Sequence, residues 1–280
     1  MPCPLVTAVV PVHNRRDLTL RFIRHWQALT YARRQLIIVD DGSNDGTADA
    51  VDSVAPEVLV LREDGNAWWS GATNTGVRRA LADGTDLVLT INDDAVFPPD
   101  FLENLILAHL AHPKAMIGCR IMRQDDPSKV WASGVSAPFT LRRIFVLLDH
   151  DLHWGNIPTK GAVRPCDTLC GNGTLIPVRV FRSIGFFDQY RLPQYHGDGD
   201  FALRHRRSGG VNLVALDAAI ANHITSALPR SKWDTLFSKR SPLYLPALVT
   251  LLWRHAPLWK SPFILIAHLL PPLFLGPRRK

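Results

Sequence analysis

The chain is poor in cysteine and lacks the cysteine and histidine spacing of a structural zinc site. Its 280 residues include four irregularly spaced cysteines, Cys3, Cys119, Cys166 and Cys170. Cys166 and Cys170 lie close in sequence, but no second cysteine pair or histidine pair completes a tetrahedral site. We therefore expect reduced thiols in a cytosolic protein.

The sequence also lacks a segment that predicts a secretory leader or a membrane-spanning helix. A strand-like run begins at residue 5, with no basic leader or apolar signal core before it. Spanning a bilayer takes about 20 apolar residues, but Arg254, His255 and Lys260 interrupt one apolar stretch and Pro271-Pro272 breaks the next. We predict tail helices that pack on the domain or lie in a membrane interface, and a cytoplasmic protein that is peripheral at the inner face of the membrane.

Acidic residues are scarce in the tail, so the positive charge of the chain is concentrated there. The formal net charge is +7, yet residues 230–280 hold nine Lys or Arg and one acid, Asp234, so residues 1–229 are close to neutral. A main domain without basic excess argues against nucleic-acid binding, whereas the tail suits an anionic membrane surface. We predict one domain over residues 1–228 and a basic, apolar helical tail over 229–280.

Two acidic clusters are present, each at the end of an apolar run typical of a β-strand. LIIVDDGSNDGT spans residues 36–47, and DLVLTINDDAVF spans residues 86–97. In an open α/β sheet, ligands bind outside the carboxyl ends of the strands. We therefore expect Asp40, Asp41, Asp93 and Asp94 at one edge, where a cation or ligand hydroxyls must offset their repulsion.

Strand and helix patterns alternate along the first 110 residues. Apolar runs predict strands at 5–12, 36–39, 58–61 and 86–91, and helical spacing predicts helices at 17–29, 47–54, 73–81 and 98–110. Further on, 178–184 and 200–207 are typical of helices, 130–132, 141–148 and 211–216 of strands, and 149–164 of a long loop. This order predicts an α/β fold whose mainly parallel central sheet is flanked by helices.

Six sequence strings occur in order at predicted strand ends or helix starts. They are PVHNR (11–15), VDDGSNDGT (39–47), NAWWSGATNTG (66–76), INDDAVFPPDFL (91–102), GNGTLIP (171–177) and YHGDGDFALR (195–204). Together they resemble glycosyltransferase family 2, an inverting family with the GT-A fold, over about residues 5–225. The paired tryptophans and the string PQY (193–195) resemble its rhamnosyltransferase-like members.

The resemblance implies a hexosyl- or deoxyhexosyltransferase that uses a UDP- or dTDP-linked sugar, a saccharide or lipid-linked acceptor, and Mg²⁺ or Mn²⁺. A homodimer is a further possibility. The cation would neutralise the diphosphate as it leaves. The family pattern assigns the metal to Asp94 and His223, with Asp93 on the donor side. Asn92 stands where the family's acidic motif has its first Asp. This departure affects the role assigned to Asp93 more than the role assigned to Asp94. The alternative for both carboxylates is a solvated turn.

The donor and acceptor sites are expected on the other strings. Carboxylates can accept hydrogen bonds from a base imide or ribose hydroxyls, although helix capping ahead of Thr47 is an alternative use of this turn. The resemblance implies donor contacts from Pro11, His13, Asn14, Asp40, Asp41, Gly71 and Asn74. Acceptor contacts are expected from Trp69, Asn172, Gly173 and Asp200.

Asp198 is the expected general base. Inverting transfer needs a carboxylate that takes the proton of the acceptor hydroxyl as it attacks opposite the leaving group. Family members commonly have two adjacent acids here, but Gly197 precedes Asp198 in this chain. Asp200 is therefore the rival, unless it is a charge at a helix start that pairs with Arg204.

Other classes of protein fit the sequence less well. A sugar nucleotidyltransferase or a dehydrogenase would need a Gly-rich loop after the first strand, and residues 11–14 (PVHN) do not provide one. A catalytically inactive glycan-binding or scaffold protein would not need Asp94 and Asp198. Turnover of a nucleotide-sugar, as opposed to binding alone, distinguishes that class from an enzyme.

Overall fold

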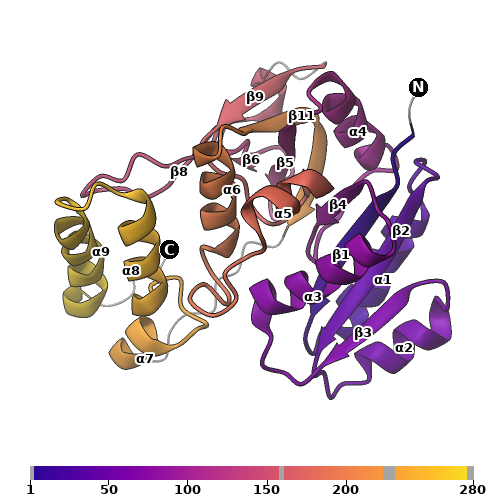
Figure 1. Cartoon of the computed structure of the whole chain (residues 1–280), viewed down its shortest axis with the longest axis horizontal. Coiled ribbons are helices and arrows are strands. Elements are labelled where there is room, and N and C mark those ends of the chain that lie inside the picture. Colours follow the sequence, from indigo (N-terminus) through magenta and orange to yellow (C-terminus); the bar gives the residue numbers. More distant parts are fainter. Residues whose placement is uncertain (1–2, 158–160, 223–230, 276–280) are drawn as a thin grey trace.

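A computed structural model of the protein describes residues 3–157, 161–222 and 231–275, which form a mixed sheet covered by helices (Figure 1). The nine-stranded sheet has the order β3-β2-β1-β4-β10-β5-β11-β9, with β6 against β5, and β7 pairs with β8 separately. The strands are β1 (Val6–Val12), β2 (Arg34–Asp41), β3 (Leu59–Glu63), β4 (Leu87–Thr90), β5 (Ala115–Arg123), β6 (Val130–Ala132), β7 (Val135–Ser136), β8 (Val146–Leu147), β9 (Val163–Cys166), β10 (Thr174–Pro177) and β11 (Val211–Asn222).

The first four strands form the parallel half of the sheet that the apolar runs predict. β1 pairs with β2 on one side and with β4 on the other, and Val12 lies opposite Asp40 in the register. Parallel pairing buries both faces of such strands, which explains their continuous Val, Ile and Leu content. The shared direction brings the polar residues after β1, β2 and β4 to one edge.

β10 is an insertion that the sequence patterns do not predict. It runs antiparallel between β4 and β5, and thereby joins the two halves of the sheet. The strand is four residues long and its partners are 56 to 90 residues away, so no local periodicity marks it. Gly173 precedes it with φ +82°, and a Cβ there would lie 2.2 Å from the Cys119 sulfur. This tight entry sets Asn172 beside the end of β4.

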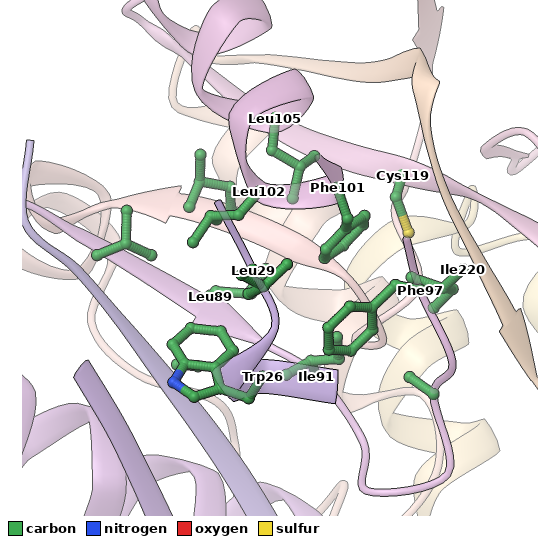
Figure 2. Packing of buried hydrophobic residues seen from close by; sticks show 14 of the residues in the cluster. Trp26, Leu29, Leu89, Ile91, Phe97, Phe101, Leu102, Leu105, Cys119 and Ile220 are labelled. Atoms are coloured by element: carbon green, nitrogen blue, oxygen red, sulfur yellow. The ribbon is translucent and has the colours of Figure 1, made fainter. Parts of the chain in front are cut away.

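Helices cover both faces of the sheet. On one face, α1 (Arg16–Gln27) and α4 (Phe101–Ala111) bury Phe22, Trp26, Phe101 and Leu105 against β1, β4 and β5 (Figure 2). The other face is covered by α3 (Trp68–Ala82), α5 (Val178–Ile184) and α6 (Gly197–Arg207). Full burial of one such large apolar side chain contributes about 1.5–3 kcal/mol, so both layers hold the site edge rigidly.

Several predicted boundaries differ from the structure. α2 (Thr47–Val54) and α5 have the predicted bounds, but α3 and α6 begin earlier, at Trp68 and Gly197. Residues 141–148 supply only the short β8, whereas β11 extends past a register shift between Ala215 and Ala219 to Asn222. Contacts with residues that are distant in sequence fix where these elements begin and end, and α3 and α6 are examples at the site.

The tail folds back onto the main body of the protein. It contains α7 (Lys232–Phe237), α8 (Leu245–His255) and α9 (Ser261–Leu275). Leu248, Leu251 and Leu252 of α8 are buried together with Phe139 and Leu203, and α9 packs on α8. Within the described ranges, no helix combines the length and apolarity needed to cross a bilayer.

Candidate active site

A cavity of about 390 Å³ opens at the carboxyl ends of β1, β2 and β4. This is the edge at which open α/β sheets bind ligands. Its walls come from the start of α1, the first turn of α3, the segment before α6 and the segment after α7. The lining residues used below are Pro11, His13, Arg15, Asp41, Trp68, Trp69, Asn92, Asp93, Tyr195 and Arg240.

Asp93 and Asp94 follow β4 and share one arginine. Arg15 Nε lies 3.1 Å from Asp93 Oδ1, and Arg15 Nη2 lies 2.9 Å from Asp94 Oδ2. Thr19 Oγ1 donates to the other Asp93 oxygen at 3.3 Å. Asp94 Oδ1 is buried and has no hydrogen-bond partner in the described structure. A buried carboxylate oxygen without a partner is costly, which suits a position reserved for a cation.

Asp93 is 2% exposed, and this burial raises the pKa of its carboxyl to about 7, with Arg15 opposing the shift and Asp94 adding to it. Near neutral pH the Asp93 carboxyl is therefore partly protonated. Two adjacent acids are tolerated here because the Arg15 guanidinium pairs with both of them and reduces their repulsion. Additional positive charge in this corner favours the ionised form.

The residues present fit a Mg²⁺ or Mn²⁺ ion that is held only partly by protein. Such ions are typically bound through one or two carboxylates together with substrate phosphates and water. Asp94 offers the free oxygen, with Asp93 adjacent. In the described part of the chain, no three His, Cys, Asp or Glu side chains form a complete cation site. The predicted ligand His223 lies outside the described residues.

The turns after β1 and β2 are tied together on one side of the cavity. His13 Nδ1 lies 2.6 Å from the Asp41 carbonyl oxygen, so this nitrogen carries the proton and donates. Asn14, with φ +52°, accepts from the Asn44 N–H through its side chain at 2.8 Å. Asp40 is buried, and its Oδ1 accepts from the Ser43 N–H at 2.9 Å. Pro11 and His13 line the cavity, whereas Asp40 shapes the turn behind it.

Asp41 holds the beginning of α3. Its Oδ1 accepts from the Ala67 N–H at 3.0 Å, and its Oδ2 accepts from the Trp68 N–H at 2.7 Å. These contacts satisfy backbone donors that a helix start leaves free. They also explain why α3 begins at Trp68, a residue with φ +57°. The Asp41 carboxylate lines the cavity, but both of its oxygens are already used by the backbone.

Asn74 was expected near the diphosphate, and the structure places it elsewhere. The side chain is 1% exposed. Its Nδ2 donates to the Phe187 carbonyl and to Gln189 Oε1, both at 2.9 Å, and its Oδ1 accepts from the Phe187 N–H. Asn74 therefore fixes the segment between α5 and α6. Gly71 is buried beside Ala67 and Gln189 on the same side of α3.

Two consecutive hydrogen bonds at the end of β4 connect Trp69, Asn92 and Asn172. Trp69 Nε1 donates to Asn92 Oδ1 at 3.0 Å, and the Asn92 N–H donates to Asn172 Oδ1 at 3.0 Å. Asn172 is buried, and its Nδ2 has no partner among the described atoms. Gly173 acts through its backbone, which pairs with Thr90 and Cys119. Of the expected acceptor residues, Trp69 lines the cavity, and Asn172 and Gly173, which precede β10, support it from behind.

Asp198 lies in the first turn of α6, next to these hydrogen-bonded residues. Its Oδ2 accepts from the Gly171 N–H and its Oδ1 from the Gly199 N–H, both at 2.8 Å. A Cβ at Gly171 would lie 2.4 Å from the Trp69 ring and 3.2 Å from the Asp198 Cβ. Asp198 is half-buried and is not among the residues that line the cavity, but it lies behind Trp69, which does line it.

Asp200 has no access to the cavity, which contradicts an acceptor contact. Its side chain is fully buried. Arg204 Nε is 2.8 Å from Oδ2, and Arg254 Nη1 and His255 Nε2 are 3.2 and 2.9 Å from Oδ1. The carboxylate faces the tail, so Asp200 joins α6 to α8. The predicted pairing with Arg204 is present.

Arg15 and Arg240 are charged residues of the cavity that were not singled out from the sequence. Arg15 ends the string PVHNR, so its motif marked it, but its partners lie almost 80 residues away. Arg240 belongs to the tail, in a segment whose sequence gives no sign of a contact with the main domain. Only the return of the tail over the cavity reveals it.

The comparison with known sequences agrees with this geometry. Residues 7–161 match Glycosyl transferase family 2. The N-acetylglucosaminyl-diphospho-decaprenol L-rhamnosyltransferase of Mycobacterium tuberculosis (strain CDC 1551 / Oshkosh) is 24% identical over 260 residues, covering 86% of this chain and 82% of that protein. A UDP-N-acetylglucosamine–dolichyl-phosphate N-acetylglucosaminyltransferase of Methanococcus voltae is 26% identical over 138 residues, 44% of this chain and 54% of that protein.

Solved structures share the fold. A mannosyltransferase from Pyrobaculum calidifontis, in complex with GDP-Man and Mn²⁺, matches with a TM-score of 0.62 and 20% identity over 97% of this chain and 72% of its own. GalNAc-T7 with UDP, GalNAc and Mn²⁺ matches with a TM-score of 0.65 and 12% identity, over 85% of this chain and 49% of its own. These likenesses confirm the GT-A fold, and the family match confirms the prediction from the sequence: the chain belongs to glycosyltransferase family 2 and is a glycosyltransferase.

Proposed function

We propose that the protein transfers a hexose or deoxyhexose from a UDP- or dTDP-linked donor to a hydroxyl group of a saccharide or lipid-linked acceptor, with inversion at the anomeric carbon. One observation carries the proposal: Asp93 and Trp69 line the same cavity, and Asp198 lies behind Trp69, on the other side of Gly171. The rhamnosyltransferase similar to this chain supports a deoxyhexose donor and a prenyl-linked acceptor.

The donor diphosphate is assigned to the Asp93–Asp94 corner. Asp94, through its free Oδ1, would hold a Mg²⁺ or Mn²⁺ ion that supplies charge neutralisation for the leaving group. The Mn²⁺ in both solved structures supports this use of a divalent cation. The nucleoside is assigned to the side lined by Pro11 and His13, which the turns after β1 and β2 hold in place.

The transfer step is assigned to Asp198. The acceptor oxygen forms a bond to the anomeric carbon while the bond from that carbon to the diphosphate oxygen breaks. The proton of the acceptor hydroxyl passes to the Asp198 carboxylate, and the bonding electrons leave with the nucleoside diphosphate. The N–H groups of Gly171 and Gly199 orient the carboxylate, so it need not reorganise as the hydroxyl approaches.

A lipid-linked acceptor would require the site to work beside a membrane, and the tail supports this. Trp233, Trp253 and Trp259 are 73%, 67% and 71% exposed. Phe263 and Ile266 are also exposed, on one side of α9. Aromatic side chains beside lysines are typical of helices that lie in a membrane interface. We assign the tail to peripheral association with an anionic membrane.

The test combines a donor screen with two aspartate variants. UDP- and dTDP-sugars are incubated with Mn²⁺ and a prenyl-diphosphate-linked saccharide, and the released nucleotide is measured. Asp198→Asn should lower transfer by about 10²–10⁴-fold while nucleotide affinity stays unchanged, because an amide cannot take the proton.

Asp200→Asn is the matched control, assayed well below its melting temperature, and should retain transfer. If Asp200→Asn abolishes transfer with fold and donor affinity intact while Asp198→Asn keeps it, the assignment of the base is wrong. If no nucleotide-sugar is turned over by the unmodified protein, the proposed reaction is wrong.

A further inference from the structure

The segment of residues 238–244, which joins α7 to α8, passes over the rim of the cavity; we call it the rim segment. Arg240 of this segment lines the cavity. Lys239 Nζ lies 5.4 Å from the centroid of the ring of Trp68, another residue that lines the cavity. The sequence predicts a tail that is separate from the catalytic domain. In the structure, this tail brings two consecutive cationic side chains to the site.

The rim segment forms a turn that is held against the main domain. Ser241 is buried, and its N–H donates to the Ser238 carbonyl at 3.0 Å. The Pro242 carbonyl accepts from His196 Nε2 at 2.8 Å, and His196 is the residue immediately before α6. The first bond closes a turn around Arg240, and the second ties this turn to the start of the helix that carries Asp198.

Arg240 has no ion-pair partner among the described residues of the cavity, because the other charged side chains there are engaged elsewhere. Arg15 is engaged by Asp93 and Asp94, and Asp41 is engaged by the backbone at the start of α3. Among the described residues, no carboxylate lies within ion-pair distance of Arg240, and its guanidinium makes no hydrogen bond. An exposed guanidinium held at a cavity rim is suited to an anion supplied by the ligand, and its planar donors match phosphate oxygens.

We propose that Arg240 binds a diphosphate group of a substrate, so that the tail completes the active site. The inference rests on the proposed transfer from a nucleoside-diphosphate sugar. Two diphosphates meet that description, the one in the donor and the one in a prenyl-diphosphate acceptor. Lys239, stacked over Trp68, adds positive charge at the same rim.

The test measures binding and needs no turnover. Isothermal titration calorimetry with Mn²⁺ gives dissociation constants for UDP, dTDP, uridine, thymidine and, in detergent, farnesyl diphosphate. Arg240→Met removes the guanidinium, and Arg240→Lys keeps the charge but not the planar donors. Lys260→Met is the matched control, because Lys260 is an exposed tail cation over Trp259 and does not line the cavity.

Arg240→Met should weaken binding of UDP and dTDP by at least about tenfold, the loss expected for a charge-assisted hydrogen bond. Arg240→Lys should recover part of this loss, whereas nucleoside affinity and the Lys260→Met protein should be unchanged. A loss confined to farnesyl diphosphate assigns Arg240 to the acceptor.

Unchanged affinity for every diphosphate, or an equal loss for the nucleosides, overturns the proposal. If the unmodified protein binds neither UDP nor dTDP, the proposed donor class is wrong, and the farnesyl diphosphate measurement alone decides the role of Arg240.

Discussion

Asp200→Asn should strongly destabilise the protein, because it removes the only carboxylate that the described structure places at the centre of a buried ionic network joining α6 to α8. Arg204, Arg254 and His255 would then face an amide. Removing one partner of a buried ion pair costs about 3–5 kcal/mol. Arg254 keeps Asp188 at 2.6 Å, and Arg204 keeps two carbonyl oxygens. We therefore expect the lower end, about 3 kcal/mol, because these partners still compensate part of the charge.

Thermal unfolding followed by circular dichroism measures the effect. About 3 kcal/mol corresponds to a decrease in Tm of roughly 6–12 °C for a protein of this size. Asp83→Asn is the matched control, because Asp83 and Arg79 also form an i,i+4 pair but are solvent-exposed. Such surface pairs contribute about 0.3–0.5 kcal/mol. Equal decreases in Tm for the two variants would refute the structural role of Asp200.

The pH dependence of stability gives a second measurement. Burial alone would raise the pKa of Asp200, but the hydrogen bond from His255 and the charges of Arg204 and Arg254 outweigh it and lower the pKa to about 2. An acid whose pKa is lower in the folded state stabilises the fold above its unfolded value of about 3.9, and this stability is lost as the pH falls towards 2. The contribution is about 2 kcal/mol. Between pH 4 and 2, unmodified protein should lose that much more stability than Asp200→Asn.

Two further outcomes are expected. Asp94→Asn should abolish the Mn²⁺-dependent part of nucleoside diphosphate affinity in calorimetry while circular dichroism shows an intact fold. Near-normal sugar transfer by this variant would contradict the metal assignment. Liposomes with anionic lipids should carry the protein upward in flotation, since each basic residue near such a surface contributes about 1 kcal/mol, and replacing Trp253 and Trp259 by Ser should reduce the floating fraction. Equal flotation of folded unmodified and variant proteins would show that these tryptophans do not hold the protein at the membrane.

The sequence alone determined the parallel half of the fold and the position of its ligand edge. The apolar runs before Asp40 and Asp93 are local signals, since a strand buried on both faces must be apolar along its length. Strands of the same direction end at the same edge, so the acidic clusters could be placed together without coordinates. The order of the six strings was sufficient to indicate the family, which the comparison with known sequences confirmed.

Tertiary structure decided what the individual polar side chains do. Asn74 and Asp200 have sequence contexts as suggestive as that of Asp198, yet the first fixes a loop and the second binds the tail. Apart from Arg204, the predicted partner of Asp200, their partners lie 54 to 115 residues away, and a hydrogen bond over such a separation leaves no periodic trace in the sequence. For the same reason, no local pattern in the sequence predicted β10 or the position of Arg240. Arg240 reaches the cavity only because α8 buries its apolar side against the main body.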